Sequence, residues 1–478
     1  MDDYITTSIV YCMVTVDFHH IRGPEIEHVF PQSIELPKEW SILPFLCLPD
    51  GAHMQEKDFV YFTLPYPNPQ HSTAFGLACS RQLSINHVKN LPSDVTRPSI
   101  QKAVVLICST PQFGHIKDNL EIVTDAYFSQ NDFSNLSILH DFYESLVNKG
   151  PQLQVSLGVN SKDVFLCWKQ NTLVLLKLVL LGKKVLVYDR VAERLGNLQY
   201  SLLSLIPNML LSLHDSADPS SNYLQSTLSK PSSLKTSDRD SLMAYIGFPL
   251  LLFGEKSMFS PYIPLQQVHI LESCSTRSWL AGSTNTLIML NQNKMADVVV
   301  RADTEEIFYK DNSLRSLVNL TRADKRWMDD VLSVISAHEE KSLPEYEGNN
   351  EWLRAQFEAY IFGFLSTIKY YSFLNSRDEN ELQKYNSLPS TDCISDYGQT
   401  FLDEWMKTAT YAAWNPIADD DMFDVVLAQH PSCQTRPQKL STRLSGFLSS
   451  IRNSQLYKTS VEPSAMQTSS HSHPNNEK

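Results

Sequence analysis

Hydrophobic and polar residues follow a mainly strand-like pattern in the first third of the chain, and the pattern changes afterwards. Five short runs in this first part have the alternation or the β-branched, apolar content that is typical of strands. They cover residues 8–18, 26–30, 59–64, 74–80 and 102–109. Gly23 and Pro24 separate the first two runs and predict a β-hairpin, and helical spacing takes over at residues 115–147. Residues 1–150 are therefore predicted to form an α+β domain, an antiparallel sheet followed by helices.

A buried helix leading into a buried strand is predicted over residues 161–188. Ser161 is a favourable N-cap residue, and Gly182 can adopt the left-handed conformation that ends a helix. The β-branched run at residues 185–188 has the composition of a strand buried on both faces. A membrane span is the alternative, but Lys177 interrupts the apolar run, which is much shorter than the ~20 residues that a span needs. The stretch is thus predicted to lie in the core of a layered α/β domain.

Residues 151–310 are predicted to form this central α/β domain. Four more short apolar runs occur in it, at residues 247–253, 278–282, 286–290 and 296–301. The first of them is predicted to be a buried strand. Strands spaced by helices predict a mostly parallel, doubly wound sheet with helices on both faces. Residues 215–240 are rich in Ser, Asp, Pro and Lys, so a disordered insertion is predicted there.

The pattern beyond residue 310 is helical up to about residue 430. Apolar residues recur at three- and four-residue spacing over residues 314–320, 325–338, 352–374 and 397–414. Residues 431–478 are rich in Ser, Thr, Gln, Asn and Pro and are predicted to be a disordered tail. The tail has one apolar cluster, residues 444–451, between Arg443 and Arg452. This cluster has two interpretations, a short amphipathic segment that binds lipid or a disordered segment with a few apolar residues.

Composition excludes several classes of function. The 478 residues carry a formal net charge of −13, whereas a general nucleic-acid-binding protein needs a basic surface that displaces counterions. The same charge argues against bulk adsorption to anionic lipid and leaves a local basic patch as the route to peripheral membrane association. The eight cysteines include no CxxC pair. Four of them (Cys12, Cys79, Cys108 and Cys167) lie in apolar runs, which is typical of buried thiols in a reducing compartment. The N-terminus lacks a signal-peptide pattern, so we expect a cytoplasmic protein.

The chain carries no recognisable reaction motif. It has no GxxxxGK[ST] phosphate loop, no GxGxxG turn and no GxSxG elbow, so we expect no cofactor, no metal and no catalytic residue. An α/β enzyme whose site is assembled from distant residues is the disfavoured alternative.

Polar residues follow the predicted strand at residues 278–282. They are Ser283, Thr284 and Asn285, and Asp297 begins the next apolar run. Partners dock at strand ends in doubly wound sheets, so these four residues are a candidate docking edge. The alternative is a turn in which Ser, Thr and Asn cap the next element.

A second polar turn lies within residues 46–53. Asp50 and Gly51 predict a tight turn there, and the two interpretations are again a docking site or a simple turn.

Seven short motifs occur in series along the chain. They are RGPEIE at residues 22–27, LCLPDGAH at 46–53, FGLACSRQ at 75–82, LKLVLLGKKVL at 176–186, GFPL at 247–250, RSWLAGSTN at 277–285 and DVVV at 297–300. Their order resembles the DENN-domain proteins, in particular the late-secretory-pathway branch and the related LCHN protein. The resemblance covers residues 8–430.

The resemblance implies a tripartite module with a longin-like N-terminal domain, a doubly wound α/β central domain and a helical C-terminal part. It implies a guanine nucleotide exchange factor or regulator for a Rab-type small GTPase in vesicle-mediated transport. Such a factor holds the switch segments of the GTPase in a conformation that fits Mg²⁺ and nucleotide poorly, so it needs no acid–base residues. The alternative is a non-catalytic tether or scaffold in late secretory traffic. Either function places the protein on Golgi or secretory vesicle membranes.

Overall fold

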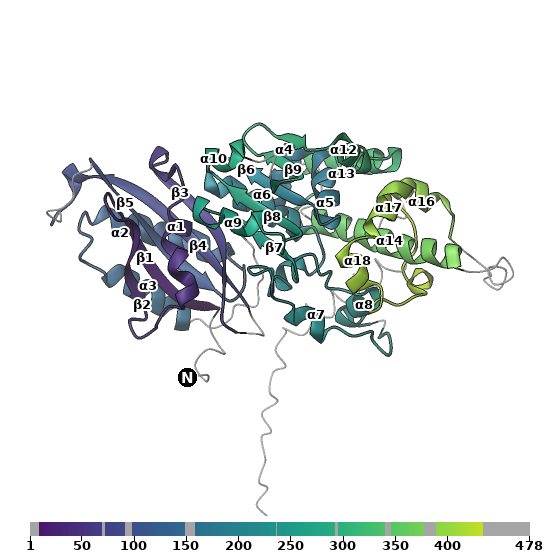
Figure 1. Cartoon of the computed structure of the whole chain (residues 1–478), viewed down its shortest axis with the longest axis horizontal. Helices are drawn as coiled ribbons and strands as arrows, with labels where there is room; N and C mark the ends of the chain where they lie inside the picture. Colours follow the sequence, from purple (N-terminus) through teal and green to yellow (C-terminus); the bar gives the residue numbers. More distant parts are fainter. Residues whose placement is uncertain are drawn as a thin grey trace, which may run out of the picture.

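The computed structural model describes residues 9–68, 72–90, 98–148, 158–235, 237–291, 295–339, 346–376 and 389–433. Within these residues the chain forms two five-stranded sheets and a helical part, which follow one another along the long axis in chain order (Figure 1). This confirms the predicted mixed α/β fold. The division into separate domains stays a prediction, because one cluster of buried side chains runs from Val10 to Val426 through all three parts.

The N-terminal sheet is antiparallel and has the strand order β2-β1-β5-β4-β3. Its strands are β1 (Val10–His19), β2 (Gly23–Phe30), β3 (Lys57–Pro65), β4 (Thr73–Ser84) and β5 (Ser99–Cys108). Between β2 and β3 lie η1 (Lys38–Ile42), α1 (Leu43–Cys47) and the single turn η2 (Ala52–Met54), and η3 (Ile85–His87) follows β4. The helices α2 (Gly114–Ser129) and α3 (Ser137–Asn148) then pack on the strands. The predicted hairpin and the predicted change to helices are both confirmed.

The central sheet has the order β10-β9-β6-β8-β7, in which only the β9–β10 pair is antiparallel among the described strands. Its strands are β6 (Lys184–Tyr188), β7 (Ser257–Ser260), β8 (Ser278–Ser283), β9 (Val298–Arg301) and β10 (Glu306–Tyr309). The helices α5 (Asn171–Leu180) and α6 (Ala192–Ser204) pack with Val185 and Val187 on one face. The helices α9 (Val268–Glu272) and α10 (Thr286–Leu290) pack with Leu186 on the other face. Alternate residues of β6 thus face opposite helical layers, as a doubly wound sheet requires.

The helical part surrounds the long helix α14 (Asn350–Ser376), of which more than half the residues are buried. The remaining helices are α4 (Ser161–Trp168), α7 (Tyr223–Thr227), α8 (Arg239–Ile246), α12 (Asn312–Leu317), α13 (Arg322–Glu339), α16 (Asp392–Tyr397), α17 (Gln399–Trp405) and α18 (Ala409–Trp414). Short 3₁₀ turns, η4 (Met209–Leu211), η5 (Leu265–Gln267), η6 (Met422–Asp424) and η7 (Pro431–Cys433), complete the described chain. The single run predicted over residues 397–414 is therefore divided into two helices, α17 and α18, and its first residue, Tyr397, ends α16.

The helix predicted after Ser161 is interrupted. Lys169 has a φ of +48° and separates α4 from α5, whereas Gly182, with a φ of +58°, ends α5 as predicted. Ser161 is not the N-cap that the sequence predicts, because Asn160 occupies that position and the Ser161 hydroxyl instead lies 2.8 Å from the hydroxyl of Ser204.

The buried strand predicted at residues 247–253 is wrong. Gly247 has a φ of +91° and ends α8, and Leu252 N–H bonds the carbonyl of Leu250 in a tight turn. Pro249 has no N–H to donate to a neighbouring strand. These residues are buried as irregular chain, and the strand at this edge is β7.

The disordered insertion predicted over residues 215–240 is also wrong for the residues that the structure describes, 215–235 and 237–240. The Asp215 carboxylate is 2% exposed and accepts hydrogen bonds from Ser72 Oγ (3.0 Å) and Leu224 N–H (2.7 Å). Ala217 N–H donates to Thr73 Oγ1 at 3.0 Å. Polar residues that lack a hydrophobic pattern are thus held by hydrogen bonds to β4 and the residue before it.

All eight cysteines are free thiols. Cys12, Cys79 and Cys108 are buried as predicted, but Cys167 is exposed and its thiol lies 2.9 Å from a carboxylate oxygen of Glu305. No helix in the described ranges is long and apolar enough to cross a membrane. The predicted tail, including residues 444–451, lies outside the described residues, except for Pro431, Ser432 and Cys433.

Candidate partner-docking surface

The carboxyl end of β8 packs tightly against the chain that follows β7. Ile263 N–H donates to the carbonyl of Gly282 at 2.7 Å, and Ser283 Oγ donates to the carbonyl of Ile263 at 3.1 Å. A Cβ on Gly282 would lie 2.1 Å from the carbonyl oxygen of Pro261, so no larger residue fits without a shift of the backbone. Ser283 is fully buried, which makes it a structural residue of this junction and leaves no surface for a partner.

Thr284 and Asn285 contact the turn at Asp50, the second polar turn that the sequence singles out. Thr284 Oγ1 donates to the carbonyl of Asp50 at 2.7 Å, and Asn285 Nδ2 donates to its carboxylate at 2.7 Å. Asp50 N–H in turn donates to the hydroxyl of Tyr262 at 3.0 Å. Gly51, with a φ of +85°, allows the turn to fold in this way. The two candidate turns therefore form one junction between the N-terminal part and the central sheet.

Asn285 also caps α10. Its side-chain oxygen accepts hydrogen bonds from the N–H groups of Leu287 (2.7 Å) and Ile288 (3.4 Å), which is the usual role of Asn at an N-cap. The capping alternative that the sequence allows for residues 283–285 therefore describes what their side chains do within the chain.

Asp297 lies at the other end of the central sheet. It precedes β9 and its carboxylate accepts a hydrogen bond from Lys184 N–H at 3.0 Å, level with the start of β6. Ser283 is level with Tyr188 at the end of β6. The structure thus brings Ser283, Thr284 and Asn285 together and does not bring Asp297 to them.

Exposed apolar residues lie on the chain segments that form this junction. Leu287 and Leu290 on α10 are 55% and 72% exposed, and Met54, three residues after Gly51, is 65% exposed. Leu265, two residues after Ile263, is 43% exposed. These four residues, here called the α10 surface, lie on three chain segments that the hydrogen bonds above hold together. Single exposed leucines are ordinary, but several around one junction are typical of an interaction site.

Sequence reasoning missed the α10 surface because it assigns apolar residues to the core. The available signal was the spacing of Leu287 and Leu290 around Ile288, which is buried and faces the central sheet. On a helix of one turn, three apolar residues so close together cannot all face inward.

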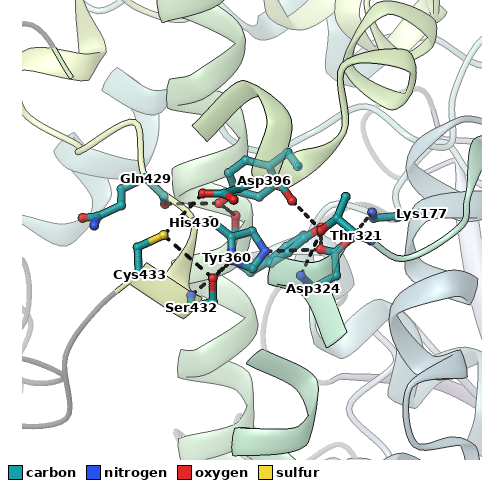
Figure 2. Close-up of polar contacts among 10 residues, drawn as sticks. Lys177, Thr321, Asp324, Tyr360, Asp396, Gln429, His430, Ser432 and Cys433 are labelled. Atoms are coloured by element: carbon teal, nitrogen blue, oxygen red, sulfur yellow. Dashed lines mark hydrogen bonds and ion pairs between the residues drawn. The ribbon is translucent and has the colours of Figure 1, made fainter. Parts of the chain in front are cut away.

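A separate cluster of titratable side chains lies where α5 meets the helical part (Figure 2). Lys177 Nζ and Asp324 Oδ2 are 2.6 Å apart, and neither side chain is exposed. Asp324 also accepts hydrogen bonds from Tyr360 OH (3.0 Å) and Thr321 N–H (3.0 Å). Burial alone raises the pKa of Asp324, but the Lys177 ammonium and the hydrogen bonds lower it further, so the pKa is about 2.

His430 completes this cluster. Ser432 N–H donates to Nδ1 at 3.1 Å, so Nδ1 is an acceptor and Nε2–H is the group that donates to Asp324 at 3.2 Å. The side chain of His430 is fully buried. Lys, Asp and His meet here as they do in some active sites, but every polar atom has a partner inside the protein and no substrate can reach them. The cluster joins α5, α13 and α14 to the segment after α18.

Neither of two open spaces lined by described residues is an enclosed reaction site. A void of about 10 Å³ between α5, α6 and the sheet is lined almost wholly by apolar side chains such as Leu175, Val187 and Leu202. A groove of about 660 Å³ lies open to the surface beside β10. In the described part of the chain, no group of three or more His, Cys, Asp or Glu residues is placed to hold a metal ion.

Comparisons with known proteins agree on one family. The family described as "Transport protein Avl9" matches residues 10–368. The chain is 58% identical over 453 residues to the late secretory pathway protein avl9 of Schizosaccharomyces pombe, covering 95% of this chain and 96% of that protein. It is 33% identical over 468 residues to the late secretory pathway protein AVL9 of Saccharomyces cerevisiae, covering 90% of this chain and 61% of that protein.

Proposed function

Since the chain belongs to the Avl9 family of transport proteins, we propose that it serves vesicle transport in the late secretory pathway, as the names of both relatives state for those proteins. We propose further that it works by binding a Rab-type small GTPase and promoting release of its nucleotide. The place of action is the cytosolic face of Golgi or secretory vesicle membranes.

The α10 surface is the observation on which this proposal rests. Exposed apolar side chains there stand on segments that are fixed by hydrogen bonds at Asp50, Thr284 and Asn285. A rigid apolar surface loses little conformational entropy when a partner covers it, which favours tight association. The order of DENN-like motifs supports a GTPase as the partner. The enclosed cluster around Asp324 supports binding over bond chemistry, since its titratable groups are out of reach of solvent.

Nucleotide exchange by such a surface needs differential binding. The protein would bind the nucleotide-free GTPase more tightly than the GDP-bound form, and the difference in affinity would set the largest acceleration that it can produce. Exchange by this route requires no acid–base residue with a shifted pKa at the α10 surface.

Release of fluorescent GDP from a panel of purified Rab proteins tests the proposal. The full chain is expected to accelerate release from at least one of them. Leu287→Asp with Leu290→Asp is expected to remove the acceleration, because two charges would be desolvated at the interface. Ile122→Asp is the matched control, since Ile122 on α2 is also 65% exposed and lies outside the α10 surface.

Each outcome separates the alternatives. If no Rab protein releases GDP faster, exchange activity is contradicted and the tether or scaffold is favoured. If the parent protein and the Leu287→Asp/Leu290→Asp variant accelerate GDP release equally, the α10 surface is not the docking site.

A further inference from the structure

Strand β10 leaves one edge of the central sheet without a neighbouring strand in the described part of the chain. Lys310 N–H donates to the carbonyl of Asp297, and Ala302 N–H, on the other side of β9, donates to the carbonyl of Tyr188. Main-chain groups alternate in direction along a strand. Those of Ile307 and Tyr309 therefore point away from β9, and no described residue bonds them.

The surface groove of about 660 Å³ runs beside this free edge. Its lining includes the residues of β10 and Glu305 before it. It also includes residues of α12, α13 and the chain between them, such as Val318 and Leu320, and Val174 of α5. A free strand edge beside a partly apolar groove is the arrangement that binds an extended segment by adding a strand.

The end of the described chain is linked to the lining of this groove through Asp396 and Thr321. Cys433 Sγ lies 3.3 Å from a carboxylate oxygen of Asp396, and the carbonyl of Asp396 accepts a hydrogen bond from Thr321 Oγ1 at 2.6 Å (Figure 2). Thr321 directly follows Leu320 of the groove lining. The chain from Cys433 to Leu444 can span up to about 36 Å when extended, so the cluster at residues 444–451 can reach the groove.

The apolar content of that cluster suits the groove. Glu305 and Glu306 line the groove and are exposed, and Arg315 and Lys325 line it as well, so the groove carries charges of both signs. Arg443 and Arg452 flank the cluster, which supplies four large apolar residues, Leu444, Phe447, Leu448 and Ile451. A tethered segment also has an effective concentration in the millimolar range, so weak contacts are enough to keep it bound.

We propose that residues 440–452 of the same chain bind the groove beside β10, with their main chain paired to Ile307 and Tyr309 and one arginine near Glu305 and Glu306. This interaction is separate from the α10 surface, because none of the four residues of that surface lines the groove. It also covers a strand edge that would otherwise be free to pair with another chain.

Hydrogen–deuterium exchange of the full chain, read in peptides that cover residues 303–311, tests this binding. The parent is expected to protect the amides of Ile307 and Tyr309. Leu444→Asp with Leu448→Asp is expected to raise their exchange rates about tenfold or more, because paired amides exchange only on opening. Both changes lie outside the described residues and so leave the contacts described above in place. Met466→Asp, farther along the tail, is the matched control and is expected to leave the rates unchanged.

Adding a synthetic peptide of residues 440–452 to the Leu444→Asp/Leu448→Asp variant is expected to restore protection. Equally fast exchange in parent and variant would overturn the proposal, as would failure of the peptide to protect. Protection that persists in the variant and grows with protein concentration would also overturn it and assign the edge to a second copy of the chain. These outcomes do not depend on any GTPase, so they are distinct from the test of the proposed function.

Discussion

Replacing Lys177 by Met is expected to destabilise the protein more than any surface lysine substitution. The change keeps the length of the side chain but removes the ammonium that lies 2.6 Å from Asp324 in a site with no exposure. Removing one member of a buried ion pair costs about 3–5 kcal/mol, because the other charge is left buried without its partner. Hydrogen bonds from Tyr360, Thr321 and His430 remain and favour the lower half of this range.

The pH dependence of this cost gives a second, independent check. In the parent, the pKa of Asp324 is about 2, below the ordinary value of 3.8, so its stabilisation is present above pH 3.8 and is lost as the pH falls through 2. Without Lys177, burial dominates and the pKa of Asp324 rises above 3.8. The carboxyl then becomes neutral at a higher pH, so Lys177→Met is expected to cost less at pH 5 than at pH 8.

Guanidinium unfolding followed by tryptophan fluorescence measures the effect, since Trp327 stacks on Tyr360 beside the cluster. Lys407→Met is the matched control, because Lys407 is 72% exposed in its ion pair with Glu404 and its loss is expected to cost less than about 1 kcal/mol. Lys177→Met with Asp324→Asn is expected to cost less than Lys177→Met alone, as no unpaired charge remains. A cost below about 1 kcal/mol for Lys177→Met, or one that grows toward pH 5, would refute this reasoning.

Three further predictions concern the junction between the sheets. Gly282→Ala is expected to reduce the free energy of unfolding by about 1–3 kcal/mol and so to lower the melting temperature, because the new Cβ would lie 2.1 Å from the carbonyl of Pro261. Gly254→Ala is the control, since a Cβ on Gly254 would have nothing within 4 Å, and its melting temperature is expected to be unchanged. Asn285→Ala removes the cap of α10 and is expected to cost about 1 kcal/mol in chemical unfolding, and an unchanged midpoint would show that the cap contributes nothing. Asp58 accepts hydrogen bonds from the first N–H groups of α6, and burial raises its pKa to about 6. The stability that this carboxyl contributes is therefore present below pH 3.8 and is lost as the pH rises through 6. Melting temperatures of Asp58→Asn are accordingly expected to fall less than those of the parent between pH 4 and pH 7, and parallel curves would contradict this.

Local sequence pattern predicted the elements whose partners are close in sequence or whose burial is regular. The strands of the antiparallel N-terminal sheet, the strands β6, β8 and β9, and the long helix α14 all follow from periodicity. The pattern failed where an apolar run is buried as irregular chain, as at residues 247–253, because periodicity reports burial and not hydrogen bonding.

Contacts between distant residues explain the remaining differences. Asp50 and Asn285 are 235 positions apart, and each alone resembles an ordinary turn residue. Asp215 is ordered through Ser72, which nothing in its own neighbourhood indicates. The α10 surface and the enclosed cluster at Asp324 likewise depend on which side chains meet in three dimensions, and one sequence does not contain that information.

Direct binding of a nucleotide-free Rab-type GTPase to the full chain tests the central claim most closely, because exchange by differential binding requires that complex. Immobilised protein is expected to retain at least one Rab protein when a chelator removes Mg²⁺ and nucleotide, and to lose it when GDP and Mg²⁺ are added back. Leu287→Asp/Leu290→Asp is expected to abolish retention, and Ile122→Asp to preserve it. Retention that does not change when GDP and Mg²⁺ are added, or that is equal for the parent and both variants, would contradict the account.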